Sequence, residues 1–190
     1  MTRKLFAIVP AVAVLVLVSE TGICGPYLQT NLTSDLPGVA AHQDPHLVNP
    51  WGIASLATSP FWISDNGAGV ATLYNGTGTP QPLVPQPLVV TVPPPLGGTP
   101  PSAPTGAVAN TTPDFGGSHF IFAAEGGTIA AWTSGTNAIL QVDNSGADAV
   151  YKGLAIGNNG SNLIYAANFR SGTRRVQWRL LAGYSCGRVY

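Results

Sequence analysis

Short runs of alternating apolar and polar residues fill the chain from about residue 49 onward, and three stretches follow one pattern. Each copy has a glycine and a short apolar strand, then a loop, an aromatic-rich strand ending at a polar residue, and a glycine turn before another strand. The three aromatic-rich strands are residues 61–64, 120–124 and 163–167. A period of two residues is typical of β-strands, so the sequence predicts an all-β protein.

The spacing of the copies indicates the architecture. The glycines that begin them, Gly52, Gly106 and Gly153, are 54 and 47 residues apart by their numbering. A four-stranded propeller blade repeats about every 40–50 residues. We therefore predict a β-propeller fragment of about three blades, at about 49–92, 103–142 and 150–173 within a domain of 26–173. A β-sandwich is the alternative, although it does not require a shared motif.

A proline-rich segment separates the first two copies. Ten of the 17 prolines lie in residues 80–104, and the sequence Pro-Gln-Pro-Leu-Val occurs at 80–84 and again at 85–89. Proline cannot donate a hydrogen bond to a sheet. Residues 88–92 are therefore predicted to form an edge strand, and residues 93–104 a surface loop.

The N-terminus has the layout of an export signal. Arg3 and Lys4 precede an apolar run at residues 5–18. This pattern predicts a helical signal peptide at residues 1–25, and the run is short for a membrane span. A buried helix or an anchor is the alternative. The protein is expected to be periplasmic, extracellular or on the cell surface, with no integral span after cleavage.

Charge excludes one class of partner. Charged residues make up 8% of the chain, against about 25% in a typical soluble domain. Residues 24–173 contain seven acidic and two basic residues, which gives a net charge of −5. A nucleic-acid-binding surface needs a basic face, so nucleic acid is not expected as a partner. The sequence indicates no specific partner.

Four polar residues form the candidate site. Asp65, Asn66, Glu125 and Asn168 follow the aromatic-rich strands at similar repeat positions. In a propeller such positions converge on the central channel, where carboxylate and amide oxygens suit Ca²⁺. The alternative is that these side chains close tight turns by bonding to the backbone. No nucleophile elbow, phosphate loop or dinucleotide motif occurs, so no catalytic residue and no organic cofactor is predicted.

Two other groups of residues bear on possible sites. His42, Asp44 and His46 lie close together and could hold a metal, although Asp44-Pro45 also favours a plain turn before the next strand. Trp51, Trp62 and Trp132 are predicted to lie in the core between blades.

Several stretches resemble one protein family. They are residues 31–40, 47–53, 65–67, 72–76 and 151–155. These stretches are similar to a family of exported bacterial proteins that has no assigned activity and includes some members with PEP-CTERM sorting tails. The resemblance covers about residues 31–173. It implies a six-bladed propeller related to NHL-repeat and gluconolactonase-type folds, and the latter use acidic and amide metal ligands in the channel.

The resemblance ends at residue 173, and the pattern changes with it. Residues 174–190 hold four of the eight basic residues and lose the strand alternation. With permitted codons and one nucleotide skipped, this stretch can be read as VEFNGDFSPVTVAGAFT, which continues the third copy with a strand and an Asn-Gly turn. We therefore expect residues 174–190 to be an out-of-frame tail and the chain to be truncated.

Three functional hypotheses remain open at this stage. The intact parent is an extracytoplasmic binding scaffold, or it is a metal-dependent lactonase or related hydrolase. The third hypothesis is that this chain is a truncated and inactive product. The favoured interpretation is that the intact parent is a binding scaffold and that this chain is a truncated, inactive product of it.

Overall fold

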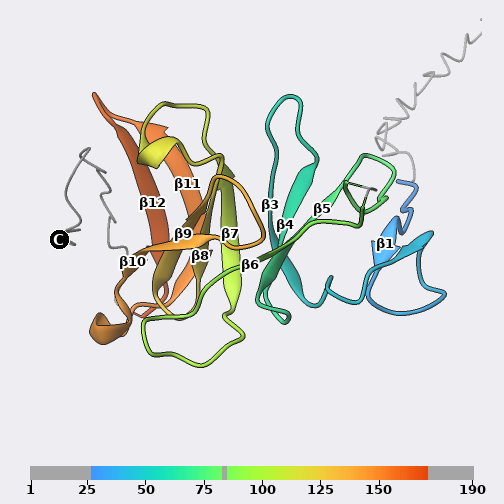
Figure 1. Cartoon of the computed structure of the whole chain (residues 1–190), viewed down its shortest axis with the longest axis horizontal. Coiled ribbons are helices and arrows are strands. Elements are labelled where there is room, and N and C mark those ends of the chain that lie inside the picture. Colours follow the sequence, from blue (N-terminus) through green and yellow to red (C-terminus); the bar gives the residue numbers. More distant parts are fainter. Residues whose placement is uncertain (1–26, 83–84, 171–190) are drawn as a thin grey trace, which may run out of the picture.

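A computed structural model describes residues 27–82 and 85–170, and in this part the protein is all-β. Two four-stranded antiparallel sheets and one two-stranded hairpin follow one another along the chain, and they do not close on each other (Figure 1). The predicted signal peptide and out-of-frame tail lie outside the described residues. No helix in this part of the chain is long and apolar enough to cross a membrane.

The strands of each sheet are neighbours in chain order. The first sheet consists of β3 (Pro50–Ala54), β4 (Phe61–Asp65), β5 (Val70–Tyr74) and β6 (Val89–Thr91). The second sheet consists of β7 (Pro104–Ala109), β8 (Phe120–Ala124), β9 (Thr128–Trp132) and β10 (Ile139–Asp143). The third consists of β11 (Tyr151–Asn158) and β12 (Asn162–Asn168).

Three smaller elements complete the description. A short parallel pair, β1 (Thr33–Ser34) and β2 (His42–Gln43), precedes the first sheet. Two 3₁₀ turns occupy Phe115–Gly117 and Ser145–Ala147. β6 is one of the two edge strands of the first sheet, and residues 92–103 after it contain no strand.

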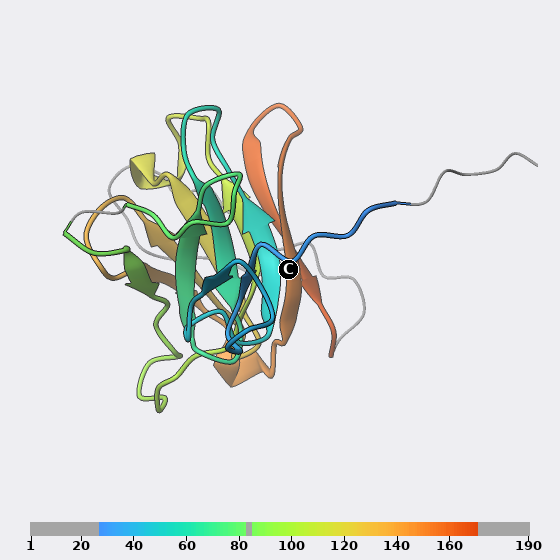
Figure 2. The same ribbon diagram turned by 90° about the vertical axis from the view of Figure 1, so that its right-hand side faces the viewer.

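We call Gly52, Gly106 and Gly153, which begin the three copies, the anchor glycines. Gly52 and Gly106 must lack a side chain because the first strands of successive sheets approach closely. A Cβ on Gly52 would lie 2.4 Å from the carbonyl oxygen of Thr105 in β7. A Cβ on Gly106 would lie 2.5 Å from the backbone nitrogen of Leu154 in β11. β7 therefore lies between β3 and β11, and the same step relates each sheet to the next. Seen from the N-terminal side, the sheets lie one behind another (Figure 2).

A second repeated contact joins the hairpin turns to the following sheet. Gly69 and Gly127 end the turns before β5 and β9, and both have positive φ, 71° and 75°. A Cβ on Gly69 would lie 2.9 Å from the Ser102 nitrogen, and one on Gly127 would lie 2.6 Å from the Ala149 oxygen. Each turn thus packs against the segment that leads into the next sheet.

Alternation in β8 places apolar side chains on both of its faces. Phe120 and Phe122 face the first sheet, where the Trp62 ring stacks on Phe120 with centroids 4.3 Å apart. Ile121 and Ala123 face the third sheet and pack with Ile129, Tyr151, Ile164 and Ala166. The inner strands β8 and β9 are therefore buried on both faces, which explains their nearly continuous apolar sequences.

One predicted core residue lies elsewhere. Trp62 is buried and Trp132 packs against the same cluster, but Trp51 is 46% exposed, so its placement in the core was wrong. The Trp51 ring lies beside the Lys152 ammonium, which is 4.9 Å from the ring centroid, and belongs to neither buried cluster. The ring consequently lies outside the inter-sheet core.

Candidate functional site

The second strand of each sheet ends in the same way, and this brings polar residues to one end of the stack. The backbone N–H groups of Asn66, Glu125 and Phe169 donate to the residue before the first strand of their own sheet, at 3.2, 2.9 and 2.8 Å. Asn66 and Glu125 are therefore structural equivalents. Asn168 pairs with Tyr151 in the ladder as Asp65 pairs with Pro50, so Asn168 corresponds to Asp65.

Asn66 and Glu125 meet between the first and second sheets. The Asn66 amide nitrogen lies 3.5 Å from Glu125 Oε2, and the Asn49 amide donates to Asn66 Oδ1 at 3.1 Å. The other carboxylate oxygen of Glu125 accepts from the Lys152 ammonium. The Lys152 and Glu125 side chains are each 32% exposed, so the ion pair is partly solvated.

Two aromatic rings border this ion pair. The Lys152 ammonium lies 4.9 Å from the ring centroid of Trp51 and 5.9 Å from that of Phe169. A cation over an aromatic face within about 6 Å is attracted by the ring quadrupole. We call Asn49, Trp51, Asn66, Glu125 and Lys152 the rim cluster. It combines an ammonium, a carboxylate, two amides and a half-exposed indole.

Sequence reasoning did not include Trp51 and Lys152 in the site, although their repeat position could have indicated them. Both residues immediately precede an anchor glycine, Gly52 and Gly153, and Thr105 occupies the same position in the second sheet. Thr105 is buried, and its hydroxyl donates to the carbonyls of Ala123 and Tyr151 at 3.2 and 2.9 Å. This position therefore links neighbouring sheets in the middle of the stack.

Asp65 lies away from the rim cluster, inside the first sheet. Its side chain is fully buried, and Oδ2 accepts from the Thr72 hydroxyl at 2.7 Å, whereas Oδ1 has no hydrogen-bond partner among the described residues. Burial raises the pKa of Asp65 from 3.8 to about 7, and the nearby Asp44 carboxylate also raises it, while the Thr72 hydrogen bond opposes the rise. Asp65 is thus a buried acid that favours its neutral form.

Asn168 caps the end of β12 rather than joining Glu125. Its side-chain oxygen accepts from the backbone N–H groups of Val150 and Arg170, at 3.0 and 3.3 Å. The amide thereby links the end of β12 to the segment before β11. The bond from the Arg170 N–H is a local side-chain-to-backbone contact of the kind found in tight turns.

The structure divides the four predicted metal ligands into separate environments. Ca²⁺ takes about six to eight oxygen ligands, whereas Asn66 and Glu125 contribute two side chains and Lys152 is paired with the carboxylate. Within residues 27–82 and 85–170, no group of three or more His, Cys, Asp or Glu is placed to hold a metal ion. The described residues do not by themselves form a complete Ca²⁺ shell.

Comparison with known proteins gives no assignment. No family model, no curated protein and no solved structure matches this chain.

Proposed function

We propose that the three sheets are consecutive blades of an exported β-propeller, six-bladed in its intact parent, which acts as a binding scaffold. The observation that carries this proposal is the meeting of equivalent repeat positions, with the Asn66 amide 3.5 Å from Glu125 Oε2 and Lys152 on the same carboxylate. A propeller places equivalent positions around one channel. The repeated approach of β3 to β7 and of β7 to β11 supports the same arrangement.

The chemistry of the rim cluster favours binding over catalysis. An ammonium, a carboxylate and two amides offer both donors and acceptors, and Trp51 offers an apolar surface beside them. A centre that hydrolyses through a covalent intermediate needs a nucleophile paired with a general base, and the cluster contains no hydroxyl or thiol. Recognition of a polar ligand or a protein surface is therefore the proposed role.

The chain by itself is proposed to be a truncated and inactive part of that scaffold. Ile53 and Phe169 are 63% and 77% exposed at opposite ends of the stack, where a ring would supply further blades. β12 has no partner strand on its outer edge among the described residues, and open edges favour aggregation.

Restoring the reading frame tests the scaffold and the truncation together. Residues 26–190 expressed alone should be poorly soluble or partly unfolded, whereas the frame-restored gene should give a monomeric protein that unfolds cooperatively. Sedimentation and chemical denaturation measure both properties. If residues 26–190 are soluble and unfold cooperatively, the proposal that the chain is a truncated fragment is wrong. If the shifted reading frame soon reaches a stop codon, the proposal of a larger intact parent is wrong.

A metal-dependent lactonase is the second candidate, favoured by the contact between Asn66 and Glu125. In this case millimolar Ca²⁺ should raise the thermal midpoint of the frame-restored protein, and the protein should hydrolyse a sugar lactone. Saturation at a hundredfold excess over Kd corresponds to about 2.7 kcal/mol. Glu125→Gln should weaken both effects. If neither effect occurs, the scaffold remains the better explanation.

Export is proposed from the N-terminal pattern alone and has its own test. Residues 1–25 fused to a reporter that is active only outside the cytoplasm should give activity, and the mature product should lack these residues. N-terminal sequencing of the secreted protein checks the cleavage. A reporter retained inside the cell with its N-terminus intact would contradict export.

A further inference from the structure

The segment before the first sheet is held there mainly by polar contacts. Residues 27–48, which we call the strap, contribute no side chain to either of the two apolar clusters. The Thr33 hydroxyl donates to the Gly78 carbonyl at 2.6 Å, and the Gly67 backbone N–H donates to the Val48 carbonyl at 3.0 Å. Elements with few buried apolar contacts open at a lower free-energy cost than a core. We therefore expect the strap to open before the sheets do.

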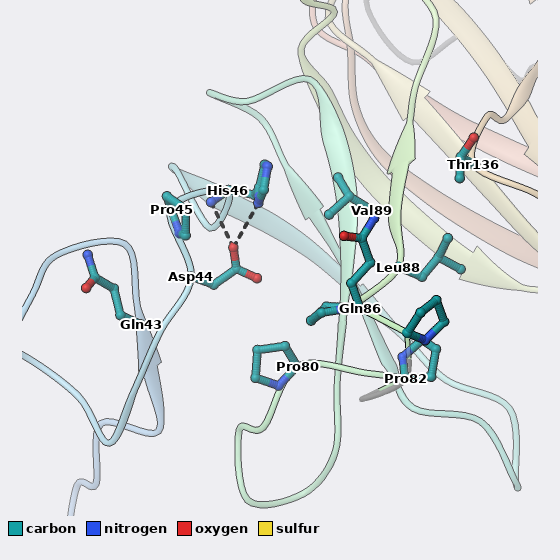
Figure 3. Close-up of a pocket in the computed structure, with 12 residues that line it drawn as sticks. Gln43, Asp44, Pro45, His46, Pro80, Pro82, Gln86, Leu88, Val89 and Thr136 are labelled. Carbon is teal, nitrogen blue, oxygen red and sulfur yellow. Dashed lines mark hydrogen bonds and ion pairs between the residues drawn. The ribbon is translucent and has the colours of Figure 1, made fainter.

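The only buried residue of the strap carries a carboxylate. Among residues 27–48, all of which the structure describes, Asp44 alone is buried, with 6% of its surface exposed. Asp44 accepts from the Tyr74 phenol, the His46 ring and the His46 backbone N–H, at 2.9, 3.0 and 2.9 Å, and Figure 3 shows the two His46 contacts. A buried ionised carboxylate is costly unless it is paired. Docking of the strap therefore depends on the charges around Asp44.

The two histidines of the strap have different partners. His42 Nε2 lies 3.3 Å from the Thr79 hydroxyl, whereas the His46 ring contacts Asp44. Of the other titratable side chains in the strap, Asp35 accepts from the neighbouring Ser34 hydroxyl at 3.4 Å, and that of Tyr27 is 95% exposed. Asp44, with its partner His46, is thus the titratable group of the strap that contacts Tyr74 in the first sheet.

A second buried carboxylate belongs to the same polar face of the first sheet. Tyr74 and Thr72 are two residues apart in β5, so their side chains share one face. Tyr74 donates to Asp44, and Thr72 donates to Asp65 Oδ2 at 2.7 Å, while Asp65 Oδ1 has no hydrogen-bond partner among the described residues. Burial raises the pKa of Asp65 to about 7, and the Asp44 carboxylate adds to the rise. The two carboxylates thus oppose each other's charge at the contact between strap and sheet.

The elements around Asp65 supply no compensating charge. None of the ion pairs among the described residues involves Asp65, and β3 and β7, which pack against β4, contain no titratable side chain. Burial raises the pKa of the Tyr74 phenol above its usual value, so Tyr74 stays neutral. Glu125 is paired with Lys152 in the rim cluster. When Asp65 ionises, its charge and that of Asp44 therefore share a buried contact with no cation between them.

We propose that pH controls docking of the strap, which lies on the first sheet while Asp65 is protonated and detaches when Asp65 ionises. Detachment lets water reach both carboxylates, which relieves their repulsion and restores the hydration of their charge. The docked state holds the proton more tightly, so rising pH favours the detached state, by up to about tenfold per pH unit for one proton. The effect levels off above about pH 7, where the docked state also loses the proton.

The distance between two spin labels tests this proposal. In the full chain, with both native cysteines replaced by Ser, one label is attached at Leu36→Cys in the strap and the other at Gln141→Cys in β10, two exposed positions. The labels should give one narrow distance distribution at pH 5 and a broad one at pH 8. Near-UV circular dichroism follows the stacked rings of Trp62 and Phe120 and should not change. The frame-restored chain with the same labels is measured beside it. Because the strap and the first sheet belong to one chain, the result does not depend on whether further blades exist.

Three variants separate the charge of Asp65 from other causes. Asp65→Asn cannot ionise and should keep the narrow distribution at pH 8. Histidine side chains also titrate in weakly acidic solution, so His46→Gln is measured as well and should keep the wild-type transition. Asp148→Asn, at an 83% exposed position, should also keep it. The proposal is wrong if the wild-type distribution is the same at both pH values or if Asp65→Asn broadens at pH 8 as the wild type does. It is also wrong if His46→Gln abolishes the transition, or if the circular dichroism of the stacked rings is lost together with the narrow distance.

Discussion

At three equivalent strand positions the first sheet carries polar side chains where the second sheet carries apolar ones. Ladder register makes Tyr74 in β5 equivalent to Trp132 in β9, because these residues lie opposite Phe61 and Phe120. By the same register Thr72 corresponds to Ala130, and Asp65 corresponds to Ala124. Polar side chains thus occupy the face of the first sheet that is apolar in the second.

The difference follows from what covers each face. Phe120, Phe122 and Ala130 of the second sheet pack against the first sheet. The corresponding face of the first sheet contacts the segment that contains β1 and β2, where Asp44 accepts from the Tyr74 phenol and the Thr33 hydroxyl donates to the Gly78 carbonyl at 2.6 Å. A loop exposes backbone groups that need hydrogen bonds, and polar side chains on the sheet provide some of them.

The repeat position of a residue therefore determines its backbone conformation and strand pairing. The element that covers the strand determines whether its side chain is polar or apolar. Both sheets keep the anchor glycine, the glycine turn and the meander. The apolar interface is expected to supply most of the stability. The stability that the polar interface contributes is expected to vary with pH. Removal of its solvent-exposed side chains is expected to cost little stability.

The largest expected effect is at the apolar interface. Phe122→Ala removes a fully buried ring between the sheets, and such truncations cost about 3–5 kcal/mol. The free energy of unfolding from urea denaturation measures this loss. Ile63→Ala, at the equivalent and only partly buried position of the first sheet, is the matched control and should cost less than half as much. Equal losses would contradict the contrast between the two faces.

Asp65→Asn should remove a pH dependence that the apolar sheet lacks. The pKa of Asp65 is 3.8 when unfolded and about 7 in the folded protein. Well below pH 3.8 both states hold the proton. As pH rises toward 7 the unfolded state loses it first, so wild-type stability falls and then levels off. At about 1.4 kcal/mol per pKa unit the loss is up to about 4 kcal/mol.

The variant cannot ionise, so its unfolding free energy should exceed that of the wild type at pH 8 and match it more closely at pH 4. Denaturation at a series of pH values measures the two curves. Asp148→Asn alters a side chain that is 83% exposed and is the control. If Asp65→Asn lowers stability at pH 8, burial does not oppose ionisation of this carboxyl group.

Much of the fold is predictable from sequence because it depends on local pattern. Alternation and anchor glycines predicted an all-β protein with repeated sheets. The separation of Asp65 from Glu125 was not predictable, since it depends on a one-residue offset in strand register and on whether a loop or a sheet covers the strand. The contact between Trp51 and Lys152 could not be predicted because these residues belong to the first and third sheets, and their contact depends on how the sheets pack.

Tyr74→Phe tests the polar interface directly, with a smaller expected effect. The phenol donates to Asp44 Oδ2 at 2.9 Å, and both groups are buried. Removing the hydroxyl leaves a buried carboxylate oxygen without this donor, which costs about 1–3 kcal/mol. Urea denaturation measures the loss, with Tyr27→Phe, a 95% exposed position, as control. An unchanged stability would mean that the segment before β3 contributes little to the fold.

The smallest expected effect is that of His46→Ala, which removes the other side-chain partner of the same carboxylate. The His46 side chain is half exposed, so water can replace its hydrogen bond to Asp44, and a typical intramolecular hydrogen bond contributes about 0.5–1.5 kcal/mol net. Asp44 also keeps the His46 backbone N–H and the Tyr74 phenol as donors. Denaturation of His46→Ala beside Tyr74→Phe therefore compares a solvated and a buried partner of one acceptor. If His46→Ala lowers the free energy of unfolding as much as Tyr74→Phe does, burial of the partner does not determine the strength of its contact with Asp44. The polar interface would then depend on the full set of Asp44 contacts.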